Sequence, residues 1–378
     1  MSQEAIPLAS PPSLATLRAS QQAAVNAGWV SRLKAIANRA GARFPVEWLG
    51  GLVLLGLACM VSLSQGRYPL PAFDLWRFVL AALGLGELPE PQYAFLHNLI
   101  VEVRLPRILT AVLVGAALSS SGAAYQAVFR NPLVSPSLMG VLAGASAGAA
   151  FGIVMGGGWF FVQGCAFFCG LLAVFIAVTI AQVFGRSSIV MLVLGGIVSS
   201  ALFSSILAVF KYVADPNNQL PAIVYWLMGS MGQARLDEIG WIAPPMLVAI
   251  LTLCLLGRAL DALSMGDDEA RALGVPARNI RLAVIALATL VSALTVSLAG
   301  MVGWIGLIVP HIARLLVGPC NGRLIPASAW LGAVFLLFAD GLARNLFAVE
   351  IPIGIVTELL GIPVFVLVLH RVRKGWES

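Results

Sequence analysis

The sequence predicts an all-α protein that crosses a membrane many times, and three observations lead to this prediction. Apolar residues make up 60% of the 378-residue chain, charged residues make up 11%, and the mean hydropathy is +0.94. Such a composition leaves too few polar side chains to cover a water-soluble globule. Uncharged runs of about 20 residues, the length of a membrane-spanning helix, recur along the chain. Finally, glycine and proline interrupt the longest of these runs.

The interruptions divide the apolar runs into ten predicted spans. The uncharged stretch 131–185 is too long for one crossing, and three consecutive glycines from Gly156 separate it into two. The stretch 282–313 is broken by Gly300, Gly303 and Pro310, which predicts one full span followed by a short or broken helix near 305–317. The ten predicted spans are 46–64, 108–129, 138–155, 159–183, 189–210, 239–256, 280–301, 305–317, 326–347 and 353–369.

Basic residues predict the orientation of these spans. An even number of spans places both termini on one side, and sixteen of the 23 lysines and arginines fall on that side. The other seven are Arg67, Arg77, Arg104, Arg107, Lys211, Arg235 and Arg344. Because cytoplasmic loops carry the excess of basic residues, we expect both termini in the cytoplasm. The net charge of +6 then reflects topology, and we expect no nucleic-acid partner.

The predicted organisation has one membrane domain between two tails. Residues 1–45 are rich in Ala, Ser, Pro and Gln and lack the apolar core of a signal peptide, so they predict a flexible cytoplasmic tail. Residues 46–371 form the predicted ten-helix domain, and 372–378 form a second cytoplasmic tail.

One compact polar insert, residues 261–281, interrupts this apolar chain on the cytoplasmic side. The stretch from Asp267 to Leu273 is predicted to be a short helix, because acidic residues in its first turn suit the helix dipole and Gly274 can cap its end. A short charged helix between two spans is typical of a docking element for a soluble partner. The alternative is a solvated loop without a partner.

Motifs for catalysis and for metal binding are missing from the sequence. It contains no phosphate-binding Gly-Lys-Ser/Thr loop, no HExxH and no nucleophile elbow, so any energy must come from another chain. Cys165 and Cys169 lie one helical turn apart, and we interpret them as small packing residues rather than metal ligands. His97, His311 and His370 are too scattered for a zinc site. We therefore expect no cofactor and no metal in this chain.

Local motifs spread over residues 46–371 resemble one known family. They are Arg104-Leu-Pro-Arg107, Gly115-Ala-Ala-Leu118, Ser121-Gly122, Gln126, Arg130-Asn-Pro-Leu133, Gly140-Val141, Gly229, Leu273-Gly-Val275, Gly306-Leu-Ile-Val-Pro310-His311-Ile-Ala-Arg314, Asp340-Gly-Leu-Ala-Arg344, Pro352-Ile-Gly354, Thr357 and Gly361-Ile-Pro363. In this order they resemble the permeases of the ATP-binding-cassette importer family for iron-siderophores, haem and cobalamin. Each motif alone is weak, but together they are specific.

The resemblance implies a type II importer in the bacterial inner membrane. Two copies of the ten-span subunit would enclose a central pathway, two cytoplasmic ATPases would bind ATP and Mg, and a periplasmic binding protein would deliver the substrate. It implies an iron chelate as the substrate, either haem or a ferric siderophore, with cobalamin as the alternative. We expect small and apolar residues of the second, fifth and tenth spans to line the pathway.

The resemblance also implies roles for individual residues. The coupling helix that contacts the ATPase would comprise Asp267, Asp268, Glu269, Ala270, Arg271, Leu273 and Gly274. The arginines that meet the binding protein would be Arg104, Arg107 and Arg344, for which anchoring in the membrane interface, or an i, i+4 ion pair of Arg344 with Asp340, is the alternative. The cytoplasmic gate would comprise Asn131, Pro132, Leu133, Ser187 and Ser188, of which the two serines are equally compatible with helix capping.

Two features depart from the family pattern, and two other functions stay open. The N-terminal tail is longer than in the shorter members, and Glu358 occupies the last span where small or apolar residues are usual. A carboxylate within the membrane is costly, so it should face the pathway or a partner within the bundle. An ion-coupled secondary transporter using Asp340 and Glu358, or an enzyme embedded in the membrane, are the alternative functions.

Overall fold

The computed structural model describes residues 46–66, 68–185 and 189–374. From Trp48 onward these residues belong to a single compact unit, to which the description below refers. The predicted N-terminal tail and the predicted gate residues Ser187 and Ser188 lie outside the described residues.

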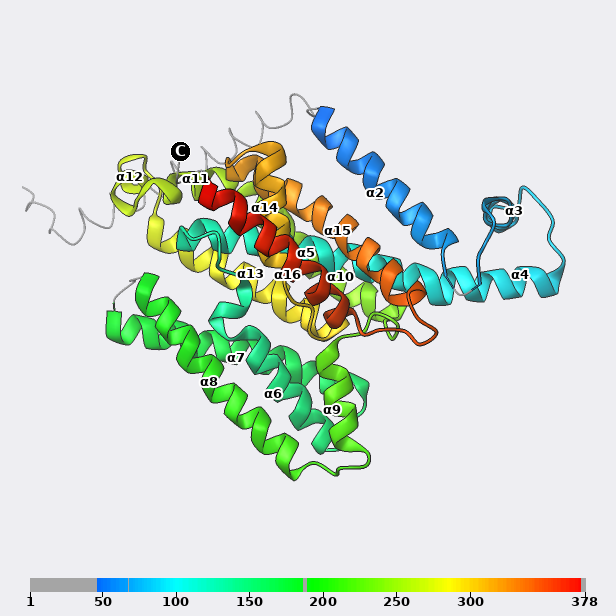
Figure 1. Ribbon diagram of the computed structural model, residues 1–378, viewed down its shortest axis with the longest axis horizontal. Helices are drawn as coiled ribbons and strands as arrows, with labels where there is room; N and C mark the ends of the chain where they lie inside the picture. The colour runs from blue at the N-terminus through cyan, green and yellow to red at the C-terminus, as the bar shows by residue number, and fades with distance from the viewer. Residues whose placement is uncertain (1–45, 67, 186–188, 375–378) are drawn as a thin grey trace, which may run out of the picture. The chain divides into compact units, whose positions relative to one another are not determined.

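The described part of the chain is entirely helical and contains no β-strand, which confirms the predicted all-α class (Figure 1). The helices in order are α2 (Val46–Ser64), α3 (Ala72–Ala82), α4 (Glu90–His97), the π-helix η1 (Asn98–Arg104), α5 (Leu105–Phe129), the 3₁₀-helix η2 (Pro136–Met139), α6 (Val141–Val154), α7 (Trp159–Gly185), α8 (Ile189–Val213), α9 (Gln219–Met228), α10 (Leu236–Leu255), α11 (Gly257–Met265), α12 (Asp267–Ala272), α13 (Ala277–Ala299), α14 (Ile305–Val317), α15 (Asn321–Asn345) and α16 (Ile353–Lys374).

A helix occupies each of the ten predicted span positions, and α2 and α14 have the predicted bounds at both ends. By length and composition, α7, α8, α10, α13 and α15 could each cross a membrane, whereas α6, α9, α14 and the apolar parts of α2 and α16 are shorter. The crossing of the membrane by ten helices therefore stays a prediction. Sequence reasoning missed α3, α4 and α9, which are short.

Helix α5 forms the centre of the unit. Nearly every residue from Ala111 to Phe129 is buried, and α5 packs against α10, α13, α14 and α15 (Figure 1). Two glycines allow the closest approaches. A Cβ atom on Gly115 would collide with the backbone of Gly332 in α15, and one on Gly122 would collide with the backbone of Gly306 in α14. Small residues permit such backbone contact, which is the main source of attraction between helices in a lipid environment.

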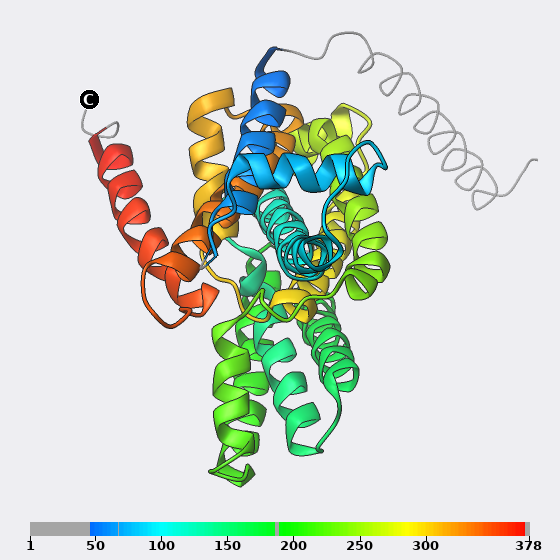
Figure 2. The same cartoon turned by 90° about the vertical axis from the view of Figure 1, so that its right-hand side faces the viewer.

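Helices α6 to α9 form a second group that lies beside the α5 group, as both views show (Figures 1 and 2). Gly144 and Gly148 of α6 press against the backbone of α7 at Cys169 and Cys165, where a Cβ atom would collide with the carbonyl oxygens. Both cysteines therefore lie where α6 and α7 pack closely, and their interpretation as packing residues stays a prediction. Helix α13 joins the groups, because it contacts both α5 and α7.

A non-helical segment, residues 300–304, separates α13 from α14, as the sequence predicts. Gly300 has φ of 68° and Trp304 has φ of 67°, a conformation that costs a residue with a side chain about 1–3 kcal/mol. The segment before α10 binds the freed backbone, since the amide of Ser230 donates to the carbonyl of Ala299 at 2.9 Å. Within the break, the amide of Ile305 donates to the carbonyl of Gly303 at 2.8 Å. The resulting α14 is a short helix of 13 residues.

The contact between α5 and α14 leads to a stability prediction. Gly122→Ala would push the backbones of α5 and α14 apart, so we expect a loss of about 1–3 kcal/mol and a lower melting temperature in detergent. The control is Gly56→Ala in α2, because no atom lies within 4 Å of the added methyl group there. Equal melting temperatures for the two variants would contradict the importance of this contact.

Candidate functional site

The polar insert folds as a short helix with a sharply defined end. Helix α12 covers Asp267–Ala272, one residue shorter than predicted, and Gly274 follows it with φ of 75°. The amide of Val275 donates to the carbonyl of Ala270 at 2.8 Å, and the amide of Gly274 to that of Arg271 at 2.9 Å. This pair of bonds is the Schellman motif, in which glycine is favoured because φ is positive. The predicted C-cap is therefore confirmed.

Asp267 fastens this helix to the rest of the unit. Its carboxylate accepts hydrogen bonds from Arg130, directly after α5, at 2.6 Å and from Arg281 in α13 at 2.8 and 3.0 Å. Arg130 also donates to the carbonyl of Leu263 in α11 at 2.9 Å. Charged hydrogen bonds of this kind are stronger than neutral ones. Helix α12 is thus tied to two of the long helices rather than suspended in a loose loop.

A second carboxylate fixes α11, the helix before α12. Asp261 accepts hydrogen bonds from the backbone amide of Asn321 at 2.7 Å and from its side-chain amide at 2.9 Å. The contact joins α11 to the start of α15. Sequence reasoning missed these partners of Asp261 and Asp267, since they lie far away in the chain or carry no motif.

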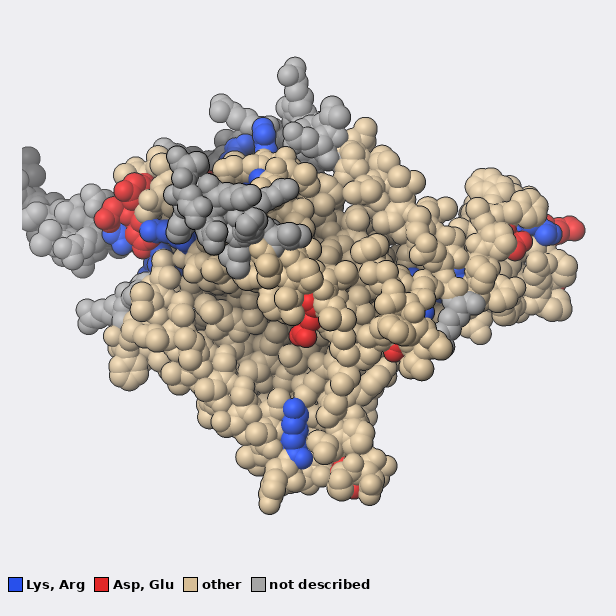
Figure 3. All heavy atoms as spheres, in the orientation of Figure 1, with Lys and Arg blue, Asp and Glu red and all other residues tan. Residues whose placement is uncertain are grey.

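The other face of the insert is exposed. Asp268 and Arg271 form an ion pair at 3.0 Å with side chains that are 92% and 68% exposed, and Leu273 is 58% exposed. Glu269 is also exposed, whereas Ala270 is fully buried against the unit. Acidic and basic side chains gather at this end of the molecule, while the flanks of the long helices carry few (Figure 3). The insert therefore presents a firmly held, charged surface.

The three predicted docking arginines gather near the start of α5, at its other end. Arg104 is buried, with 4% exposure, and donates hydrogen bonds to the carbonyls of Leu63 and Tyr68. Arg344 donates to the hydroxyl of Ser62 at 3.0 Å and pairs with Asp340 at 3.0 Å. The alternative i, i+4 ion pair of Arg344 is therefore present.

Arg107 is the centre of a larger charge network. It donates to Asp340 at 2.7 and 2.8 Å and to Glu350 at 2.6 and 3.1 Å, and its side chain is 11% exposed. The Asp340 side chain is 1% exposed, whereas that of Glu350 is 40% exposed. The buried Asp340 thus pairs with both Arg107 and Arg344, and Glu350 is the partner of Arg107 that water can reach. The structure leaves the docking role itself untested.

The predicted gate residues Asn131, Pro132 and Leu133 form a tight turn after α5. The Asn131 side-chain oxygen accepts a hydrogen bond from the amide of Leu133 at 2.9 Å, and the Leu133 side chain is 53% exposed. Nearby, Arg314 of α14 donates to the side chain of Gln126 at 2.9 Å, which brings two of the sequence motifs together. This bond joins the last part of α5, just before the turn, to α14.

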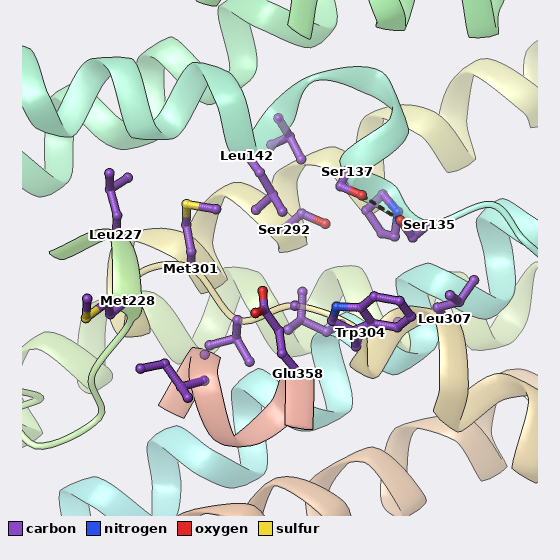
Figure 4. Close-up of a pocket in the computed structure, with 18 residues that line it drawn as sticks. Ser135, Ser137, Leu142, Leu227, Met228, Ser292, Met301, Trp304, Leu307 and Glu358 are labelled. Atoms are coloured by element: carbon purple, nitrogen blue, oxygen red, sulfur yellow. Dashed lines mark hydrogen bonds between the residues drawn. The ribbon is translucent and has the colours of Figure 1, made fainter. Parts of the chain in front are cut away.

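A cavity of about 480 Å³ opens between the two groups of helices (Figure 4). Its lining residues come from α5, η2, α6, α9, α13, α14, α16 and the broken segment before α14, and α8 supplies none. They are Leu118, Ser135, Pro136, Ser137, Val141, Leu142, Leu227, Met228, Ser292, Met301, Val302, Gly303, Trp304, Gly306, Leu307, Gly354, Ile355 and Glu358. The wall is mainly apolar, and the carboxylate of Glu358 points into the cavity.

No group of three histidine, cysteine, aspartate or glutamate residues that could hold a metal ion occurs in the described part of the chain. His97 packs against the rings of Phe78 and Tyr93, with centroids 6.4 and 6.1 Å away. The cavity wall offers only Glu358 and two thioethers as strong or soft ligands, and these come from α16, from α9 and from the segment between α13 and α14.

Comparisons with known proteins are consistent with this architecture. A permease of Haemophilus influenzae named for molybdate import is 36% identical over 334 residues, covering 88% of this chain and 97% of that protein. The hemin transport system permease of Yersinia pestis is 35% identical over 336 residues, covering 85% of this chain and 95% of that protein. Other relatives are named for iron chelatin and for cobalamin.

A solved structure shows the same fold. It is described as a metal-chelate type ABC transporter in an inward-facing conformation, and it superposes with a TM-score of 0.77 at 34% identity, covering 87% of this chain and all of that one. The model of the FecCD transport family matches residues 54–371, which include the insert, the arginine network and the cavity. The chain therefore belongs to the FecCD transport family of ABC transporter permeases.

Proposed function

We propose that this chain is the membrane permease subunit of an ATP-driven importer that carries an iron chelate, haem or a ferric siderophore, into the bacterial cytoplasm. Two copies would form the pathway in the inner membrane, with both termini in the cytoplasm. Two separate ATPases would supply the energy, and a periplasmic binding protein would deliver the substrate. The observation that carries the proposal is a mainly apolar cavity in the same unit as a firmly held, exposed insert.

The choice of substrate rests on the cavity and on the names of relatives. A mainly apolar wall with few polar groups suits a bulky chelate that must pass without tight binding. Relatives named for hemin and for iron chelatin support an iron chelate, and relatives named for cobalamin support the alternative. The relative named for molybdate favours a small oxyanion as a further candidate.

Reconstituted uptake tests the function directly. Vesicles that contain the permease, its ATPase and its binding protein should accumulate hemin or a ferric hydroxamate when ATP is added, and should not do so with a non-hydrolysable ATP analogue. Accumulation of cobalamin or molybdate alone would contradict the iron assignment and leave the importer architecture in place. Failure to transport any of these solutes would argue against an importer.

We further propose that the exposed face of α12 couples ATP hydrolysis to movement of the spans. Closure of the ATPases would push on Asp268, Glu269, Arg271 and Leu273. Asp267 would pass the force to α5 and α13 through Arg130 and Arg281, because these contacts are short and charged. A stiff helix is needed here, since a flexible loop would absorb the displacement.

The coupling proposal predicts that exposed residues of the insert are needed for transport but not for folding. Glu269→Ala with Arg271→Ala, or Gly274→Val, should leave expression intact and preserve ATP hydrolysis while uptake falls at least about tenfold, the equivalent of roughly 1.4 kcal/mol in coupling. The control is Arg323→Ala, which removes an exposed charge at the start of α15 outside the insert. Normal uptake in both insert variants would rule out the coupling role.

For Arg104, Arg107 and Arg344 we propose contact with acidic residues of the binding protein. Arg107 already holds two carboxylates, so a docked protein would compete with Glu350, its exposed partner. Guanidinium groups bind carboxylates through two parallel hydrogen bonds, which suits such an exchange.

If Arg107 contacts the binding protein, replacing Arg107 should weaken binding of that protein more than loosening the charge network around Arg107 does. Arg107→Gln should weaken capture of the binding protein by about 1–3 kcal/mol and flatten its dependence on salt. Asp340→Asn is the control, because Asp340 is buried and its replacement loosens the network without removing an arginine. Binding can be measured by surface plasmon resonance on nanodiscs. Equal losses in the two variants would mean that Arg107 has only a structural role.

A further inference from the structure

The cavity contains one ionisable side chain among its eighteen lining residues, Glu358. The others are apolar residues, glycines and a proline, three serines, two methionines and a tryptophan. None of them is a lysine, an arginine or a histidine, so the cavity wall offers no cationic side chain to a bound anion.

Glu358 is free to act on a solute in this cavity. It lies on α16 and is exposed, and in the close-up its carboxylate points towards the space between Trp304 and Met301 (Figure 4). No hydrogen bond or ion pair joins it to another residue in the described part of the chain. Gly303 lies beside it, since a Cβ atom on Gly303 would be in van der Waals contact with its Oε1 atom at 3.8 Å.

Trp304 lies on the same wall and is held in place. Its left-handed backbone, with φ of 67°, is supported by α16, where Phe365 packs against its ring with centroids 5.8 Å apart and Gly361 leaves room for it. An aromatic face beside a carboxylate attracts cationic groups, because both present negative potential to the solute.

Three helix N-termini also face the cavity, because residues in the first turns of α6, α14 and α16 line it. Each N-terminus carries the equivalent of roughly half a positive charge, and the C-terminus of α9 at Met228 carries a similar negative one. An ionised Glu358 opposes these N-termini with a full negative charge. Its effect is strong because the apolar walls screen charge poorly.

We propose that Glu358 determines which charge class of substrate the permease accepts: its carboxylate cancels the attraction of the three helix N-termini for anions, so neutral and cationic metal chelates pass and oxyanions such as molybdate are disfavoured. The proposal rests on the importer function and refines it: among iron chelates it favours ferric siderophores without net negative charge over haem, whose two propionate groups are anionic. A dianion entering the cavity would be repelled twice as strongly as a monoanion, with no cationic side chain to compensate. A chelate with a protonated amine or a neutral metal centre would meet no such barrier.

The potential can be measured without knowing the substrate. Ile355→Cys places a thiol on the cavity wall three residues before Glu358, on the same face of α16. The rates of its modification by a cationic and by an anionic methanethiosulfonate of similar size are compared in the intact complex in nanodiscs. The parent protein, with its five natural cysteines, is the blank. Ser137→Cys in η2 is a second reporter, should the first variant fail to fold.

Glu358→Gln keeps the size of the side chain and removes its charge. With this change the ratio of cationic to anionic rates should fall roughly tenfold, as expected for one partly screened charge about 6 Å away. Asp237→Asn, which removes an exposed carboxylate outside the cavity, should leave the ratio unchanged. An equal ratio with and without the Glu358→Gln substitution would overturn the proposal.

Uptake measurements separate this proposal from the proposed function. In vesicles that accumulate a ferric chelate, Glu358→Gln should raise the uptake of molybdate relative to that of a cationic ferric hydroxamate by several fold. Efficient molybdate uptake by the unaltered protein would overturn the selectivity. If no solute is transported but the labelling ratio changes as expected, the importer function fails while the effect of Glu358 on the potential of the cavity stands.

Discussion

Backbone-to-backbone contact along α5 is the constraint on which the rest of the unit depends. Within a bilayer, water cannot satisfy exposed backbone groups and no hydrophobic effect drives helices together, so close packing must hold them. Gly115 and Gly122 let α15 and α14 approach α5 at the distance of their backbones. Because α5 is surrounded on several sides, the break before α14 is enclosed by protein rather than lipid, and an irregular segment can line a cavity.

Charged side chains also need partners within the membrane, and this requirement distinguishes the paired arginines from Glu358. Arg107 and Arg344 are mostly buried but paired, Arg107 with Asp340 and Glu350 and Arg344 with Asp340. Such a network stabilises one end of the molecule, and it can exchange partners only through Glu350, which water reaches. Glu358 is the opposite case, a carboxylate that points into an apolar cavity without a partner in the described residues. An unpaired charge in this setting is costly, and a carboxylate that lies next to the cavity can act on the solute there.

Patterns that are local in the sequence could be predicted, and long-range contacts could not. The positions of ten helices follow from uncharged runs and their glycine and proline breaks, and the pair of Arg344 with Asp340 follows from helical spacing. The short helices α3 and α9 have no such signal. The bond between Arg107 and Asp340 joins residues 233 positions apart, which only the packing of α5 on α15 brings together. Glu358 could be identified from the sequence because a carboxylate within a membrane span is costly. Its neighbours in the cavity could not, because they come from other helices far along the chain.

Helix α5 carries Arg107 in its first turn, and Arg130 follows its last residue. Its 25 residues make a rod of about 37 Å at 1.5 Å per residue. One end is bonded to the Arg107 network and the other, through Asp267, to the insert. A continuous helix of this kind shifts as a whole, so the two ends form a single thermodynamic system. Whatever factor a ligand at the Arg107 end imposes on affinity at the insert, a ligand at the insert imposes in return on the Arg107 end.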